Sequence, residues 1–184
     1  MDVKVTVWVD NRGLDGFECE HGLALLIETG NRTLDFDTGA GKALLPNMQR
    51  LKIDPDQIDG VIFSHGHSDH TGGLSGLMAG RKNCMIPVFM TPGMENPCYS
   101  HHSDGAVHDI SMPESTRDVL KKMEIRRSGT FSEIMPGIYL TGAIPRVSGE
   151  GTGGNFYSDP ACTIPHQIGE EQALLFKNGL LISG

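Results

Sequence analysis

Hydrophobic and polar positions alternate at the beginning of the chain. Valine occupies every second position from 3 to 9, and this period of two predicts a half-buried strand. Two further apolar runs, residues 23 to 29 and 33 to 36, flank the turn signal Gly30-Asn31-Arg32. This arrangement predicts a hairpin, so the chain is expected to open on three strands.

The rest of the chain mixes short strands with helices. Strands are expected at 61 to 63, 86 to 91 and 137 to 142, with a second hairpin at 172 to 176 and 179 to 183. Helices are expected at 40 to 51, where Pro46 should bend or break the helix, at 74 to 79, and within 111 to 123, where Ser115 is a candidate cap. Residues 54 to 59 predict a turn or short helix, and residues 94 to 113 look irregular. The mixture predicts an α/β domain with helices packed on sheets.

Length and charge narrow the classes of function. The chain has 184 residues, enough for one sizeable core, so residues 1 to 184 are expected to form a single domain. Its formal net charge is −8, and it has no basic stripe, so a nucleic-acid partner is not expected. No apolar run has the length of a membrane span, so no membrane partner is expected either.

The cysteines and the N-terminal residues bear on the compartment. The four cysteines, Cys19, Cys84, Cys98 and Cys162, are scattered and form no CxxC pair, so free and incidental thiols are expected. The first residues show no signal-peptide pattern. Together these features favour a cytoplasmic protein.

The sequence FSHGHSDHTGG, residues 63 to 73, concentrates metal-binding side chains. His65, His67 and Asp69 are spaced two apart, so an extended segment would point them to one side, and His70 would join them as a helix begins. Neutral imidazole and carboxylate suit zinc, iron or manganese. Four donors so close together suit two adjacent metal ions, which can sit about 3.5–4 Å apart and share a hydroxide.

The H-x-H-x-D-H motif after a short apolar strand resembles the metallo-β-lactamase superfamily. Further segments resemble one of its branches, metal-dependent hydrolases that include 7,8-dihydropterin-6-methyl-4-(β-D-ribofuranosyl)aminobenzene-5′-phosphate synthases. These segments are EHGL at 20 to 23, LDFDTG at 34 to 39, SHGHSDHTGGL at 64 to 74, PGIYLTGAIPR at 136 to 146 and EEQALLFKNGLLISG at 170 to 184.

The resemblance implies a fold and a set of roles. The fold would be the four-layer αβ/βα metallo-β-lactamase sandwich, and the cofactors two divalent metal ions, zinc or else manganese or iron. His65 and His67 would bind the first ion, and Asp69 and His70 the second. Asp69 would also help to orient the attacking hydroxide, which makes it the candidate catalytic residue. Asp37 would hydrogen-bond a ligand histidine and fix its tautomer, although it could instead be an ordinary turn residue.

The resemblance also implies ligands beyond those present. The family pattern continues past the last strand with a turn that carries a further histidine, and later with an aspartate and another histidine. The sequence ends at Gly184, at the start of that turn. We therefore expect a C-terminally incomplete sandwich, a homo-oligomer or a complementing C-terminal chain, and weak activity from residues 1 to 184 alone.

Three functions remain open at the sequence level. The first is a metal-dependent hydrolase whose binuclear metal-bound hydroxide attacks a small ester, phosphoester, amide or lactone. The second is a transferase that joins a pterin methyl group to an aminobenzene ribofuranosyl phosphate. The third is a non-catalytic metal-binding or interaction fragment. All three keep a small molecule or a metal ion as the ligand.

Four other residues are candidates for the site. His101 and His102 follow a strand and could reach the metals or the substrate. Arg146 could grip a carboxylate or phosphate with its planar fork, or form a surface salt bridge. His21, beside the first hairpin, is either a pocket contact or a hydrogen-bonded structural histidine.

Overall fold

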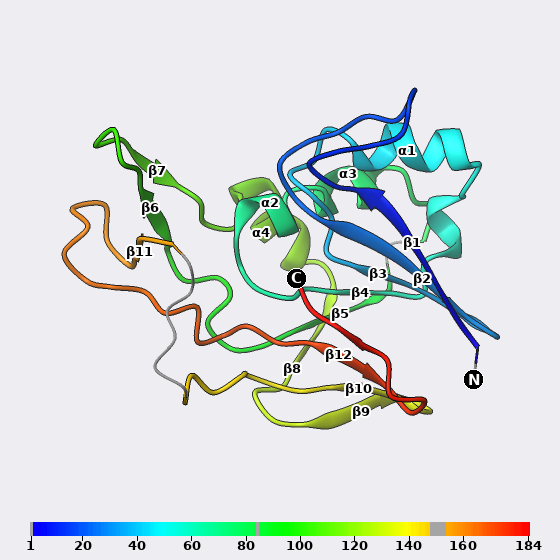
Figure 1. Ribbon diagram of the computed structural model, residues 1–184. Helices are drawn as coiled ribbons and strands as arrows, with labels where there is room; N and C mark the ends of the chain where they lie inside the picture. Colours follow the sequence, from blue (N-terminus) through cyan, green and yellow to red (C-terminus); the bar gives the residue numbers. More distant parts are fainter. Residues whose placement is uncertain (1, 84, 148–153) are drawn as a thin grey trace.

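The computed structural model describes residues 2–83, 85–147 and 154–184 (Figure 1). Within these residues the strands form three sheets. The largest has the order β1-β2-β3-β4-β5-β8, the second β13-β12-β10-β9 and the third β11-β6-β7. The strand bounds are β1 Val3–Val9, β2 Ala24–Thr29, β3 Arg32–Phe36, β4 Gly60–Ile62, β5 Pro87–Met90, β6 Tyr99–His101, β7 Val107–Asp109, β8 Glu124–Arg127, β9 Ser132–Met135, β10 Ile138–Leu140, β11 Phe156–Tyr157, β12 Leu174–Phe176 and β13 Leu181–Ile182.

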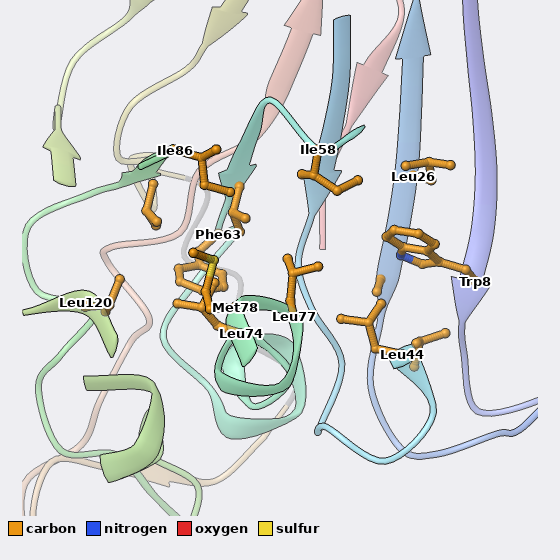
Figure 2. Packing of buried hydrophobic residues seen from close by; sticks show 14 of the residues in the cluster. Trp8, Leu26, Leu44, Ile58, Phe63, Leu74, Leu77, Met78, Ile86 and Leu120 are labelled. Atoms are coloured by element: carbon orange, nitrogen blue, oxygen red, sulfur yellow. The ribbon is translucent and has the colours of Figure 1, made fainter. Parts of the chain in front are cut away.

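Helices cover one face of the large sheet. They are α1 Leu44–Leu51, α2 Ser68–Thr71, α3 Leu74–Ala79 and α4 Glu114–Leu120, with a 3₁₀ turn η1 at Pro55–Gln57. Figure 2 shows how Leu44 of α1, Leu77 of α3 and Leu120 of α4 lie in the same buried cluster as Trp8 and Leu26 of the sheet. Because successive strand side chains point to opposite faces, this cluster takes alternate residues of β5, Val88 and Met90, whereas β1 contributes the consecutive residues Trp8 and Val9 where its register shifts.

The other face of the large sheet packs against the second sheet. Leu25, Leu34 and Ile62 of the large sheet form a second buried cluster with Leu140 and Phe176 of the second sheet. In Figure 1 the helices lie above the large sheet, and β9, β10 and β12 lie below it. The described residues thus form a helix layer, a sheet and a second sheet, which confirms the predicted α/β sandwich.

Parallel pairing sets the position of the candidate site. β1, β2 and β3 are antiparallel neighbours, as the predicted hairpin requires. β3, β4 and β5 run parallel, with Phe36 opposite Ile62 and Ile62 opposite Phe89. The carboxyl ends of these three strands therefore lie at one edge of the sheet, and the segments that follow them meet there.

Some local predictions were wrong. Pro46 neither bends nor breaks α1, because the helix begins at Leu44 and proline is tolerated in a first turn, where N–H groups have no helical partner. Ser115 is not the cap of α4, because Pro113 holds that position. The region 94 to 113 is not irregular throughout, since β6 and β7 pair within it. β8 and β9 were also missed.

Two further features of the described residues concern membrane-spanning helices and the cysteines. Across residues 2–83, 85–147 and 154–184, no helix combines the length and apolarity needed to cross a bilayer. Cys19, Cys98 and Cys162 are free thiols, as expected, and Cys84 lies outside the described residues.

Asp35 is an acidic side chain buried in the middle of β3. It is fully buried, and neither carboxylate oxygen has a hydrogen-bond partner among the described residues. Burial raises the pKa of Asp35 well above its usual value, and the nearby charge of Asp37 raises it further. The indole N–H of Trp8 opposes the rise, but it forms no hydrogen bond with the carboxylate. The ionised form of Asp35 is therefore costly in this fold.

We predict that Asp35→Asn stabilises the chain at neutral pH. A raised folded-state pKa gives a stabilising contribution below the unfolded value, near 3.8, that is lost as the pH rises through the folded value. Asparagine does not ionise, so the variant does not lose stability as the pH rises. Its free energy of unfolding at pH 7 should therefore exceed the wild-type value by at least about 1 kcal/mol. Urea unfolding at pH 7 and pH 4 checks this. The gain should shrink at pH 4, and a variant no more stable than wild type at pH 7 would contradict it.

Candidate metal centre

Two loops from neighbouring parallel strands build the site. The segment DTG, residues 37 to 39, follows β3, and the motif HGHSDH, residues 65 to 70, follows β4. The backbone N–H of Asp37 donates to Ile62 O at 2.8 Å, and the backbone N–H of Ser64 donates to Asp37 Oδ1 at 2.7 Å. Asp37 has a positive φ of 59°, which turns its side chain back between the loops. The two loops are therefore fixed relative to each other.

Glycines let the motif lie close to its neighbours. A Cβ atom at Gly66 would stand 2.0 Å from Met94 O, and one at Gly73 would stand 2.0 Å from Thr38 O. No side chain fits at either position without backbone movement. His67 precedes the first turn of α2, which carries Asp69 and His70 inward. The motif therefore combines a bend at residues 64 to 66 with the start of a helix, whereas the spacing predicted an extended segment before the helix.

The four predicted donors lie together. The ring centroids of His65 and His67 are 4.4 Å apart, and those of His65 and His70 are 4.1 Å apart. Asp69 Oδ2 lies 3.5 Å from His70 Nε2. His65 and His67 are buried, and the side chains of His70 and Asp69 are 12% and 20% exposed. The motif thus places three imidazoles and one carboxylate at the same edge of the sheet.

Asp37 and Ser64 set the orientation of two of these rings. Ser64 Oγ donates to Asp37 Oδ2 at 2.6 Å, which uses its one proton. Ser64 Oγ therefore accepts a hydrogen bond from Nδ1–H of His65, 2.9 Å away. The lone pair of the His65 ring is then on Nε2. His70 Nδ1 lies 2.8 Å from Asp37 Oδ2, so it donates to the carboxylate and also leaves Nε2 free. Asp37 is thus not an ordinary turn residue bonded to its own backbone.

His67 has different neighbours. Its Nε2 atom lies 3.4 Å from Cys98 Sγ, and its ring centroid lies 5.0 Å from that of Phe156. Cys98 is buried in the loop between β5 and β6, and Phe156 begins β11. Neither residue was a predicted member of the site. Both come from distant segments, and no local spacing in the sequence connects them to the motif.

Burial keeps two of the imidazoles neutral. It lowers the pKa of His65 well below the usual value, and the charges of His70 and His67 lower it further. Burial also lowers the pKa of His67 to about 4, against the opposing charge of Asp69. Burial alone would lower the pKa of His70 too, but the hydrogen bond and charge of Asp37 outweigh it and raise that pKa. Neutral imidazoles offer the lone pair that a metal requires.

An open hollow of about 320 Å³ lies over the imidazoles. Its walls include Arg146, whose guanidinium forms an ion pair with Glu171, and both side chains are only partly exposed. Phe156 and Ile168 add an apolar wall. Arg146 thus forms a salt bridge and also lines the hollow, and its binding of a substrate carboxylate or phosphate stays a prediction. Glu171 was not predicted.

Other predicted histidines lie elsewhere. His101 and His102 belong to the hairpin of β6 and β7, which projects to the left in Figure 1, and neither lines the hollow. His102 Nε2 lies 3.2 Å from Ser100 Oγ, and its ring lies 4.5 Å from that of His108. His21 Nε2 lies 3.3 Å from Asp69 Oδ2, with its side chain 83% exposed. His21 therefore contacts the site at its outer edge.

The residues present suit a metal in chemistry and orientation. Within the described residues, no group of three or more His, Cys, Asp or Glu side chains already stands in a metal-binding arrangement. However, His65 and His70 each have Nδ1 fixed by a buried partner, and Nε2 of His70 lies 3.5 Å from the Asp69 carboxylate. Ligating histidines in metalloproteins are held in this way.

Comparisons with known proteins agree with this geometry. The model of the metallo-β-lactamase superfamily matches residues 18–88. A 7,8-dihydropterin-6-methyl-4-(β-D-ribofuranosyl)-aminobenzene-5′-phosphate synthase of Methanocaldococcus jannaschii is 33% identical over 135 residues, which cover 70% of this chain and 45% of the synthase. The transcription termination factor FttA of Thermococcus kodakarensis is 27% identical over 153 residues, which cover 73% of this chain and 23% of that protein.

Solved structures share the fold. Tm1679, described as a metal-dependent hydrolase of the β-lactamase superfamily, superposes with a TM-score of 0.76 at 24% identity and covers 95% of this chain and 61% of its own. A quorum-quenching N-acyl homoserine lactone lactonase has a TM-score of 0.51 at 20% identity, over 84% of this chain and 55% of its own. The chain spans about half the length of these relatives. By its sequence motifs, its fold and the matched residues, the chain belongs to the metallo-β-lactamase superfamily.

Proposed function

We propose that the chain carries the metal centre of a hydrolase that acts on a small ester, phosphoester, amide or lactone. The observation that carries the proposal is the set of three clustered imidazoles, of which His65 and His70 have one nitrogen fixed by the Ser64 and Asp37 network. The superfamily fold supports it, because relatives with this fold are described as hydrolases.

Each residue would have a defined part. His65 and His67 would hold one ion, and Asp69 and His70 a second, with zinc the expected metal and manganese or iron the alternatives. Divalent ions held there would acidify a water molecule and polarise the substrate oxygen. Asp69 is partly exposed beside His70, so its carboxylate can also accept a hydrogen bond from the attacking water and orient it.

The walls of the hollow suggest a substrate with an anionic group. Arg146 is paired with Glu171, but its guanidinium carries five donors and is 31% exposed, so it retains donors for a carboxylate or phosphate. Phe156 and Ile168 would contact an apolar part of the same molecule. We therefore expect the substrate to be a small organic anion that has both a charged group and an apolar part.

A second candidate follows from the most similar curated relative named above. The M. jannaschii protein is named as a synthase, so the same centre in this chain could support transfer of a pterin methyl group to an aminobenzene ribofuranosyl phosphate. In that reaction the pterin methyl carbon would form a bond to the aminobenzene compound while its bond to a leaving pyrophosphate breaks, and no water would be added to the product. Assays with both substrate classes separate the two candidates.

We further propose that the chain acts in the cytoplasm, as a homo-oligomer or with a complementing C-terminal chain. The proposed partner chain is motivated by the length of the relatives, because this chain matches only 45% of the synthase and 61% of Tm1679. Additional ligands could come from such a partner. Gel filtration and assays with and without the C-terminal half of a relative test it.

The direct test of the function uses purified chain loaded with zinc or manganese. Bound metal is counted by elemental analysis, and turnover is measured on esters, phosphoesters and lactones with and without a complementing chain. Metal-dependent hydrolysis supports the proposal. Metal binding without turnover of any of these substrates under either condition would favour a non-catalytic metal-binding chain.

His67→Ala should remove most metal binding from the first ion site. The variant deletes one of the few side chains that would bind the ion directly. Losing a residue that only hydrogen-bonds a ligand lowers metal affinity by up to about a hundredfold, so losing the ligand itself should lower zinc affinity by at least that much. Isothermal titration with zinc measures the change. His108→Ala is the matched control, because His108 is exposed on β7 and should leave affinity unchanged. Equal zinc affinity in the His67 variant and wild type would refute the assignment.

Arg146→Ala should act on substrate charge. For an anionic ester, KM should rise on the order of tenfold, the effect of losing about 1.4 kcal/mol of binding. For a neutral ester of similar size, KM should change little, and the metal content should stay the same. Steady-state kinetics with the two esters measure this difference. An equal change for both esters would show that Arg146 acts through Glu171 and the shape of the hollow, and not through the substrate's charge.

A further inference from the structure

Each candidate ligand imidazole of the motif has a buried partner on one ring nitrogen. His65 and His70 are held at Nδ1, by Ser64 and Asp37 respectively. His67 differs, because its partner lies at the opposite nitrogen: Cys98 Sγ is 3.4 Å from Nε2. The sulfur belongs to a buried side chain and is not part of the hollow's wall. Cys98 thus contacts the His67 ring without lining the hollow.

The backbone fixes the distance between Cys98 and His67. The N–H of Cys98 donates to Ser111 Oγ at 2.9 Å, and the O atom of Cys98 accepts from the N–H of Ile110 at 2.9 Å. The O atom of Ile110 in turn accepts from the N–H of Ser68 at 2.8 Å. Ser68 is the residue directly after His67. Two consecutive backbone hydrogen bonds therefore connect the thiol's own peptide to the motif.

Close packing supports the same contact from the other end of the loop. Gly66, directly before His67, has Met94 O where a Cβ atom would lie, at 2.0 Å. Met94 is buried in the loop that continues to Cys98. Phe156 packs on the His67 ring, with a centroid separation of 5.0 Å. The ring has little freedom to turn, so the contact with the sulfur is a property of the fold.

We propose that Cys98 is a positioning residue of the metal centre, whose sulfur accepts a hydrogen bond from Nε2–H of His67. This proposal rests on the proposed function, because it assigns which nitrogen His67 offers to the metal. With Nε2 protonated and held by sulfur, Nδ1 carries the lone pair. His67 would therefore ligate through Nδ1, whereas His65 and His70 ligate through Nε2. A sulfur atom is a weak acceptor, so its role would be to favour the Nε2–H tautomer of the buried ring.

The test reads the tautomer in the metal-free chain by long-range ¹H–¹⁵N correlation spectra of the imidazoles. The expected result is Nε2–H for His67 and Nδ1–H for His65. In Cys98→Ala the His67 signals should move toward a mixture of both tautomers, while those of His65 stay unchanged. Cys98→Ser keeps an acceptor and should restore Nε2–H. Cys19→Ala, at an exposed thiol, is the matched control and should match wild type.

A second readout follows the metal. Zinc affinity should fall by about 10–100-fold in Cys98→Ala, the range for a lost partner of a ligating histidine, and should recover in Cys98→Ser. An Nδ1–H tautomer for His67 in wild type overturns the proposal, even where a variant fails to fold. A thiolate-to-cobalt charge-transfer band in the cobalt-loaded chain overturns it as well, because the sulfur would then be a ligand. Absence of metal binding by wild type defeats the proposed function, whereas the tautomer measurement still decides the role of Cys98.

Discussion

The buried carboxylate of Asp37 ties the candidate centre together. It accepts from the backbone of Ser64, from the Ser64 hydroxyl and from His70 Nδ1, over 2.6 to 2.8 Å. These donors come from the segment after β4 and from α2, whereas Asp37 directly follows β3. A single side chain thus sets the spacing of two loops and the tautomers of two imidazoles. Because the carboxylate is fully buried, removing any one donor would leave part of a charge without compensation.

The arrangement explains why the site stands at the edge of the sheet. β3, β4 and β5 are parallel, so their following loops meet without a long connection. Gly66 and Gly73 allow backbone contacts that no side chain permits, and these contacts bring the loops after β3 and β5 onto the motif. The helices and the second sheet then bury both faces of the large sheet, and the imidazoles inherit the rigidity of that core.

Much of this arrangement could be predicted from the sequence. Period-two alternation located β1, and two apolar runs around a turn signal located β2 and β3. The spacing in HGHSDH predicted that the three imidazoles and Asp69 gather. The strands β7 and β8 escaped prediction because they are short and mostly exposed, so they carry no alternating apolar signal. Cys98 escaped because it lies 31 residues from His67 in the sequence, and only the fold brings the sulfur to the ring. His101 and His102 were attractive by residue type, yet their hairpin leads away from the site.

The central claim is that these imidazoles, and not the thiol, hold a metal ion. Zinc K-edge X-ray absorption of the chain loaded with a single equivalent of zinc tests it most directly, because it identifies the atoms around the ion. The account predicts imidazole nitrogens at about 2.0–2.1 Å, with oxygen completing the coordination. A sulfur neighbour at about 2.3 Å, or a shell made of oxygen alone, would contradict it.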